Sequence, residues 1–240
     1  MKKILTIIFI SFSVVFYSQQ KYSGEVFYTI SLKTKINSKK NIENSEIQDE
    51  AKQKAQSIIK NAIDVVAYLK FTEKESLYRL DESMENDAEK GINLTRIFAG
   101  KNEIYYLNNE TKVNLLQKNN MIGQFLIIKQ PIEWEITQES KQIGNYTCFK
   151  AIKKDTISKN KKIIAWFTPQ IPVSFGPKEY NGLPGLILQV DNPVVIIKAV
   201  EIKLNPKKSV GIKEPTRGEK ITEKEYKKLL EDYFPDFNRN

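Results

Sequence analysis

The sequence predicts an α+β fold that is mainly β: a strongly curved antiparallel sheet or incomplete barrel, with one long amphipathic helix near the N-terminus and a short C-terminal helix. Three observations predict it. Strand-like runs follow one another at short intervals from residue 65 onward with no helical pattern between them, which is typical of an antiparallel meander. An apolar stripe with helical spacing precedes these runs, and a capped helical pattern ends the chain.

Residues 1–18 have the build of a secretory signal peptide. Two lysines precede an apolar run from Ile4 to Tyr17, and this run is shorter than the roughly 20 apolar residues that a membrane-spanning helix needs. Cleavage near Ser18 would leave residues 19–240 as a single curved-sheet domain. We therefore expect an exported protein, periplasmic or associated with the outer membrane, with no transmembrane segment in the mature chain.

One strand and one long helix are expected next. Residues 23–33 alternate between two faces, with Val26, Tyr28 and Ile30 on one side, as in a half-buried strand. From Glu46 to Asp64, apolar residues recur at every third or fourth position, which is the stripe of an amphipathic helix. Ser45 and Gln48 have the spacing of a capping box at its start.

The rest of the chain reads as strands, followed by one helix. The predicted strands are residues 65–72, 75–82, 92–99, 102–109, 111–118, 124–129, 133–140, 145–154, 161–168, 186–190 and 194–204. Thr222 and Glu225 form a capping box for the C-terminal helix, and Pro235 is its expected end.

Residues 168–185, the Pro/Gly loop, interrupt the strands. Its four prolines are incompatible with a regular strand or helix, and its apolar residues indicate that it packs against the body of the protein. Leu183 to Leu186 fit a type II turn, in which proline fixes φ at the second position and glycine takes a positive φ at the third. The residues expected to build this structural turn are Gly182, Pro184 and Gly185.

Composition excludes much of the usual enzyme chemistry. The chain has no histidine and one cysteine, so it has no Ser-His-Asp triad, no Cys-His pair and no histidine zinc site. A metal would need oxygen ligands, and no intramolecular disulfide can form. The sequence predicts no catalytic residue, no metal site and no cofactor; it leaves enzymatic activity open but favours a non-catalytic protein.

The chain is basic, with a formal net charge of +9. Its lysines are scattered in pairs among acidic residues and do not form one basic arm, which argues against nucleic acid as a partner. Ordinary solvated faces are therefore the expected role of these lysines; for an exported protein, attraction to an anionic membrane surface or an acidic glycan is the alternative.

Three further features of the sequence are candidate chemical sites. Cys148 lies in the middle of a predicted strand, where a buried small apolar residue is expected. Glu133 and Glu135 share one strand face, which fits a solvated surface better than an acid/base pair. The acidic residues within 81–89 lack the spacing of a calcium loop.

The segment "WFTPQIPVSFGPKEYNGLPGLILQV", with "GNYTCFKA" upstream, resembles the GLPGLI family, exported proteins of unknown function from Gram-negative bacteria. Gly182 to Ile187 match the hexapeptide that names the family. The approach to it is matched by Trp166, Pro169, Pro172, Gly176 and Pro177. The resemblance is specific over residues 144–190, and it implies no activity.

Two functional hypotheses follow from these features. In the first, the inner face of the curved sheet binds an apolar or amphipathic ligand, lipid-like or peptide, or a segment of an envelope partner. In the second, the protein belongs to an outer-membrane assembly and docks on a partner through the Pro/Gly loop. The residues expected to make the contacts are Trp166, Ile171, Val173, Phe175, Tyr180 and Leu183.

Overall fold

The computed structural model describes residues 22–33, 62–81, 93–154 and 162–234. The predicted signal peptide lies outside these ranges, and so do residues 46–61 of the predicted long helix.

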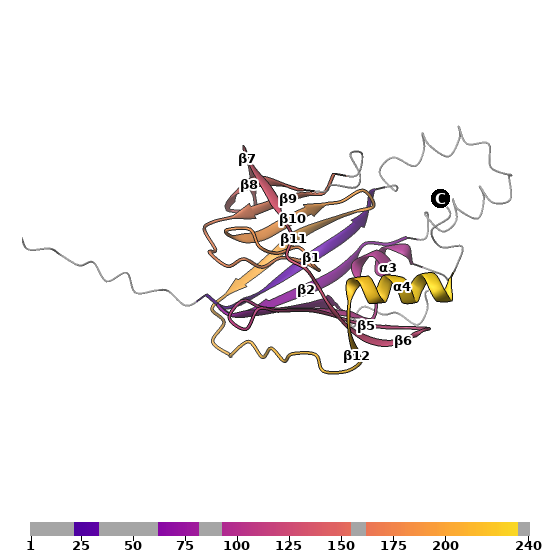
Figure 1. Cartoon of the computed structure of the whole chain (residues 1–240). Coiled ribbons are helices and arrows are strands. Elements are labelled where there is room, and N and C mark those ends of the chain that lie inside the picture. The colour runs from indigo at the N-terminus through magenta and orange to yellow at the C-terminus, as the bar shows by residue number, and fades with distance from the viewer. Residues whose placement is uncertain (1–21, 34–61, 82–92, 155–161, 235–240) are drawn as a thin grey trace, which may run out of the picture.

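Twelve strands form a single sheet in the order β12-β6-β5-β4-β3-β2-β1-β11-β10-β9-β8-β7 (Figure 1). The strands are β1 (Gly24–Leu32), β2 (Val65–Phe71), β3 (Glu75–Leu80), β4 (Glu103–Asn108), β5 (Val113–Asn120), β6 (Gly123–Ile128), β7 (Trp134–Ile143), β8 (Tyr146–Lys153), β9 (Ile164–Thr168), β10 (Leu186–Asp191), β11 (Val195–Leu204) and β12 (Glu219–Thr222). Neighbouring strands are antiparallel throughout, apart from the parallel pair β12 and β6. The sheet does not close, and β12 and β7 are its edges.

The predicted fold class is therefore wrong in two respects. The sheet is mixed and not wholly antiparallel, because the chain crosses from β11 to β12 before it pairs with β6. The long helix is also not seen in the described part of its range: residues 62–64, its predicted last residues, are not helical, and residues 46–61 lie outside the described residues. Val65 already belongs to β2 and pairs with Ile30 of β1, so pairing with a neighbouring strand outweighs the helical spacing at this point.

The predicted strand 92–99 is also wrong, because helix α3 (Leu94–Ala99) occupies this position. The side chain of Asn93 accepts a hydrogen bond from the backbone N–H of Thr95 at 3.0 Å, which caps the start of the helix. At the other end, Gly100 takes the left-handed conformation with φ 99° and donates to carbonyls of the last turn. These two caps form a short helix from a segment whose apolar pattern resembles a strand.

One face of the sheet, called here the inner face, carries the core. Tyr28, Tyr78 and Tyr105 pack edge to face across this surface, with ring centroids 6.4 Å and 5.9 Å apart. The Pro/Gly loop and the start of β10 cover the same face: Phe175 of the loop lies against Phe71 at 6.5 Å, and the hydroxyl of Tyr28 donates to the carbonyl of Ile187 in β10 at 2.7 Å. The loop thus supplies the second layer of the core.

The opposite, outer face is partly covered. Tyr106, Leu115 and Leu126 point outward yet expose only 3%, 3% and 8% of their surface. The segment between β11 and β12 runs along this part of the sheet in Figure 1, and burial, together with the charges of Glu75 and Glu214, raises the pKa of Tyr106 to about 12. The segment between β11 and β12 therefore explains why β4 to β6 have buried apolar residues on their outer face as well as on their inner face.

Helix α4 (Glu223–Tyr233) begins at the predicted capping box, which is confirmed: the Glu225 backbone N–H donates to the Thr222 hydroxyl, and the Thr222 backbone N–H donates to the Glu225 carboxylate. Tyr226 anchors the helix, because its ring contacts Phe125 at 5.4 Å and its hydroxyl accepts a hydrogen bond from Asn120 at 2.7 Å. Among the helices that the structure describes, none is long and apolar enough to span a membrane.

Candidate functional site

Five of the six residues expected to contact a ligand or partner lie in the core. Their exposed fractions are 0% for Ile171, 6% for Val173, 0% for Phe175, 4% for Tyr180 and 1% for Leu183. These side chains fill the space between the Pro/Gly loop and the inner face of the sheet. In this structure, a ligand on that face would have to displace them.

Backbone contacts hold the loop in this buried position. The N–H of Leu186 donates to Ile171 at 3.0 Å, and the N–H of Ile187 donates to Phe175 at 2.9 Å. Gly176 allows this approach, because a Cβ at this position would lie 2.5 Å from the carbonyl oxygen of Tyr180. The loop is thereby fixed along the start of β10.

The turn that precedes β10 is tighter than predicted. The N–H of Gly185 donates to Leu183 at 2.8 Å across Pro184, a three-residue turn in place of the expected type II turn. The N–H that would close the type II turn belongs to Leu186, which bonds to the loop instead. Gly185 takes a positive φ of 158°, as expected for this glycine, and Gly182 also has a positive φ, 88°.

Trp166, the sixth expected contact residue, is half-buried and packs against the core. Lys141 lies over its ring at 4.2 Å from the centroid and donates to the side-chain oxygen of Gln189 at 2.9 Å. Unlike the five loop residues, Trp166 is therefore partly exposed, with a cation over its ring.

The three weaker candidates do not form a chemical site in the described ranges. Glu133 and Glu135 are exposed. Burial raises the pKa of the Cys148 thiol to about 11, so it stays protonated near neutral pH. Residues 82–89 lie outside the described ranges. Within the described ranges, no group of three or more His, Cys, Asp or Glu side chains is placed to hold a metal ion.

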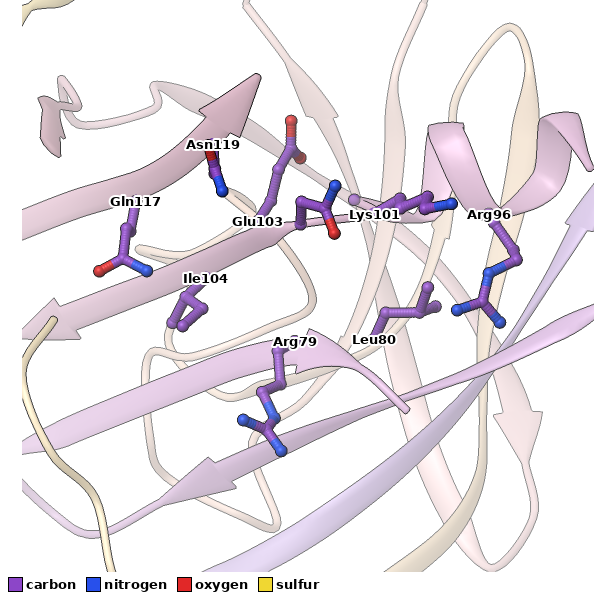
Figure 2. Close-up of a pocket in the computed structure, with 10 residues that line it drawn as sticks. Arg79, Leu80, Arg96, Lys101, Glu103, Ile104, Gln117 and Asn119 are labelled. Carbon is purple, nitrogen blue, oxygen red and sulfur yellow. The ribbon is translucent and has the colours of Figure 1, made fainter. Parts of the chain in front are cut away.

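A polar cleft of about 300 Å³ lies instead where β3 ends and α3 leads into β4 (Figure 2). It is called here the Arg79 cleft. The lining residues are Arg79, Leu80, Arg96, Gly100, Lys101, Asn102, Glu103, Ile104, Gln117 and Asn119. Side chains of Arg79, Ile104 and Gln117 come from three neighbouring strands at paired positions on the outer face.

Arg79 is the exposed cation of this cleft. Its guanidinium carbon lies 5.3 Å from the centroid of the Tyr68 ring on the paired strand, a contact that orients the group and leaves its N–H donors available. It forms no ion pair with any residue that the structure describes. Arg96 and Lys101 add positive charge, but both have interactions of their own, so Arg79 is the group that can take an anion.

The acidic residue of the lining does not neutralise the cleft. In Figure 2 the Glu103 side chain points away from Arg79, Ile104 and Gln117. On the inner face its carboxylate pairs with Lys118 at 2.6 Å and accepts the Tyr105 hydroxyl at 2.6 Å. Burial opposes ionisation of Glu103, but Lys118, Lys178 and these hydrogen bonds outweigh it, so the pKa lies below the usual value.

These groups suit binding better than catalysis. A guanidinium forms paired charge-assisted hydrogen bonds with a carboxylate, phosphate or sulfate group. The amides of Gln117 and Asn119 supply neutral donors and acceptors beside it. Glu103, the acidic side chain of the lining, is already engaged by Lys118 and the Tyr105 hydroxyl.

Sequence reasoning missed this cleft. The visible feature was one arginine inside an apolar strand, "ESLYRL", where period-two alternation places Arg79 on the solvent side. Its partners Tyr68, Ile104 and Gln117 are brought beside it by strand register, which a single sequence does not specify.

Comparison with solved structures shows similarity to PNGF-II in two crystal forms. The structure in the C2 space group has a TM-score of 0.49 with 15% identity and covers 88% of this chain and 32% of that chain. The structure in the P21 space group has a TM-score of 0.49 with 16% identity and covers 88% and 33%. This chain thus spans about a third of the length of PNGF-II. No curated protein matches the sequence.

A protein-family model matches the sequence over residues 134–161 and 152–189. These residues run from β7 through the Pro/Gly loop into β10, and they include the Gly182 to Ile187 hexapeptide that carries the resemblance noted above. The matching model is described as a protein of unknown function (Porph_ging).

Proposed function

We propose that this protein is a non-catalytic binding protein that recognises an anionic group, a carboxylate, phosphate or sulfate, in the Arg79 cleft. The observation that carries the proposal is the exposed Arg79 guanidinium, oriented by Tyr68 and not ion-paired within the described ranges, at the wall of a polar hollow. The basic charge of the whole chain favours the approach of such a ligand.

The cleft replaces the inner face as the proposed binding surface. The inner face was expected to hold an apolar ligand, but in this structure Ile171, Phe175 and Leu183 fill it with side chains that are 0% to 1% exposed. Removing such residues from the core would cost about 2 to 5 kcal/mol each. An accessible polar hollow needs no such rearrangement.

Isothermal titration calorimetry with sodium sulfate and sodium phosphate, at constant ionic strength, tests the proposal. We expect Arg79→Gln to weaken anion binding about tenfold or more, because a hydrogen bond to a charged group contributes about 1.5 to 3 kcal/mol. Arg217→Gln is the matched control, since it removes the same charge from an exposed position outside the cleft and should leave affinity within about twofold.

Equal losses in the two variants would mean that only net charge attracts the anion, and would refute a specific site. Absence of binding to the unmodified protein would refute it as well.

Export is part of the same proposal and rests on the signal-like residues 1–18. Fractionation of the native host should then recover the protein from the envelope or medium with a shortened N-terminus. A full-length N-terminus in the cytoplasmic fraction would contradict export.

A further inference from the structure

The strands from β7 to β11 bring a second group of cations together on the outer face. Strand pairing aligns Lys198 of β11 with Gln189 of β10, and Gln189 with Trp166 of β9. From the edge strand β7, Lys141 extends over this row until its Nζ lies 2.9 Å from Oε1 of Gln189. Lys141 and Lys198, called here the lysine pair, therefore approach the Gln189 amide from opposite directions across the sheet.

Two contacts hold Lys141 in this position. Its Nζ lies 4.2 Å from the centroid of the Trp166 ring, and it donates to Gln189. An ammonium group has three N–H donors, and the Gln189 oxygen takes one of them. Lys141 is half-buried and Lys198 is exposed, so a ligand can reach the remaining donors from solvent.

The acidic residues of these strands do not neutralise the lysine pair. Asp191 of β10 pairs with Lys33, and Glu139 of β7 pairs with Lys150 at 2.7 Å. Neither member of the lysine pair forms an ion pair with a residue that the structure describes. Two positive charges thus remain uncompensated on this part of the outer face.

The two charges are close enough to repel each other. Burial and the charge of Lys198 lower the pKa of Lys141, and the nearby Asp191 opposes this only in part. An anion placed between the two ammonium groups would remove this repulsion and stabilise both charged forms. The arrangement is therefore suited to a negatively charged ligand.

We propose that the lysine pair is a second anion site, which binds a phosphate group between the ammonium groups of Lys141 and Lys198 with the Gln189 amide as a neutral donor. A phosphate carries about −1.5 to −2 charges near neutral pH and three acceptor oxygens, which match two ammonium groups. A single carboxylate would leave one of the two positive charges uncompensated.

This site is separate from the Arg79 cleft. Arg79 lies on β3 and Lys198 on β11, and β2 and β1 run between them. Three spacings of about 4.8 Å place these strands about 14 Å apart, which is too far for one phosphate group to contact both residues. The inference therefore goes beyond the proposed function and does not depend on it.

Lysine acetylation with a water-soluble N-hydroxysuccinimide ester, quantified by mass spectrometry, tests the site, because only the uncharged and accessible amine reacts. Inorganic phosphate is compared with sodium chloride at equal ionic strength. We expect phosphate to slow the labelling of Lys141 and Lys198 about threefold or more, since a bound anion favours their charged form and covers them. The rate at Lys207, an exposed lysine of the segment between β11 and β12, should stay within about 1.5-fold.

Lys198→Gln removes one member of the lysine pair at an exposed position. It should raise the phosphate concentration that half-protects Lys141 about fivefold or more, because one of two charged partners is lost. Lys207→Gln is the matched control, since it removes the same charge elsewhere and should leave this concentration within about twofold. Arg79→Gln should also leave it within about twofold, because the Arg79 cleft is a separate site.

The phosphate group is either free or part of a lipid headgroup, and vesicles of phosphatidylcholine with and without phosphatidic acid separate these sources. Stronger protection of Lys141 by phosphatidic acid than by the same concentration of inorganic phosphate would assign the lipid. Equal or weaker protection would assign free phosphate. Either result retains the lysine pair as a phosphate site.

The remaining outcomes decide between the two anion sites. Equal protection of all lysines would show general screening and would overturn the second site, and so would undiminished protection of Lys141 in Lys198→Gln. Protection that is lost in Arg79→Gln alone would overturn the lysine pair and leave the Arg79 cleft. Protection that depends on Lys198, in a protein whose anion binding is unaffected by Arg79→Gln, would retain the lysine pair and refute the proposed function.

Discussion

Trp134 on edge strand β7 donates its indole N–H to the backbone carbonyl of Asn181 in the Pro/Gly loop, 2.8 Å away. Two other contacts tie this loop to distant parts of the chain: Asn109 donates to the Ser174 hydroxyl at 2.8 Å, and Lys178 donates to the carbonyl of Phe98 at 2.9 Å. The loop is therefore attached to the β7 edge, to the end of β4 and to α3. Its conformation should be coupled to the stability of the whole sheet.

Replacing Gly185 with alanine should destabilise the protein strongly. A Cβ at this position would lie 2.2 Å from the carbonyl oxygen of Thr168, where backbone on both sides has little room to move. We expect a loss of about 2 kcal/mol or more in the free energy of unfolding, measured by urea denaturation. Gly211→Ala is the control, because nothing lies within 4 Å of its Cβ position. Equal stability of the two variants would contradict the close contact between Gly185 and the Thr168 carbonyl.

The loop should behave as core when its largest apolar side chain is truncated. Phe175 is 0% exposed and contacts Phe71, so Phe175→Ala should lower the free energy of unfolding by about 3 to 5 kcal/mol through lost burial and the cavity created. Met121→Ala, at a side chain that is 93% exposed, should change it by less than about 0.5 kcal/mol. A Phe175 variant as stable as the Met121 control would show that the loop does not pack on the sheet in solution.

Glu103 should make a pH-dependent contribution to stability. Its pKa is lowered in the folded protein, so its stabilising effect is fully present above the unfolded-state pKa of about 4.3 and is lost as the pH falls through the lower folded-state value. Glu103→Gln should therefore destabilise the protein at neutral pH, and the difference from the unmodified protein should shrink in acid. Urea denaturation across this pH range measures it.

Glu110→Gln is the comparison for Glu103, because Glu110 pairs with Lys74 at a surface where both side chains are at least 60% exposed. Its effect should be small at every pH. A Glu103 difference that does not change with pH would contradict the role assigned to the ionised carboxylate.

Cys148 should be unreactive in the folded protein. The residue is fully buried, and burial raises the pKa of its thiol to about 11, so both access and thiolate are lacking near neutral pH. Labelling with a chromogenic disulfide reagent should be slow under native conditions and fast in denaturant. Rapid native labelling would show that β8 opens easily.

Part of the candidate site could be predicted from the sequence, and part depends on strand pairing. Alternation in "ESLYRL" places Arg79 on the solvent side of its strand, so the existence of an outward arginine was predictable. That Tyr68 lies beneath it, and that Gln117 shares its row, depends on pairing between β2, β3, β4 and β5. The expected contact residues of the Pro/Gly loop were recognised as apolar, but nothing local told whether they face a ligand or the core.

The sequence by itself determined the elements whose causes are local. Period-two alternation specified most of the strands, and the Thr222–Glu225 capping box specified the start of α4. The absence of histidine removed the common catalytic chemistries. The tertiary structure alone decided the parallel pairing of β12, the surface of the sheet on which the Pro/Gly loop packs and the assembly of the Arg79 cleft. Each of these depends on contacts between residues far apart in the chain, and a pattern of local periodicity carries no information about which distant surfaces meet.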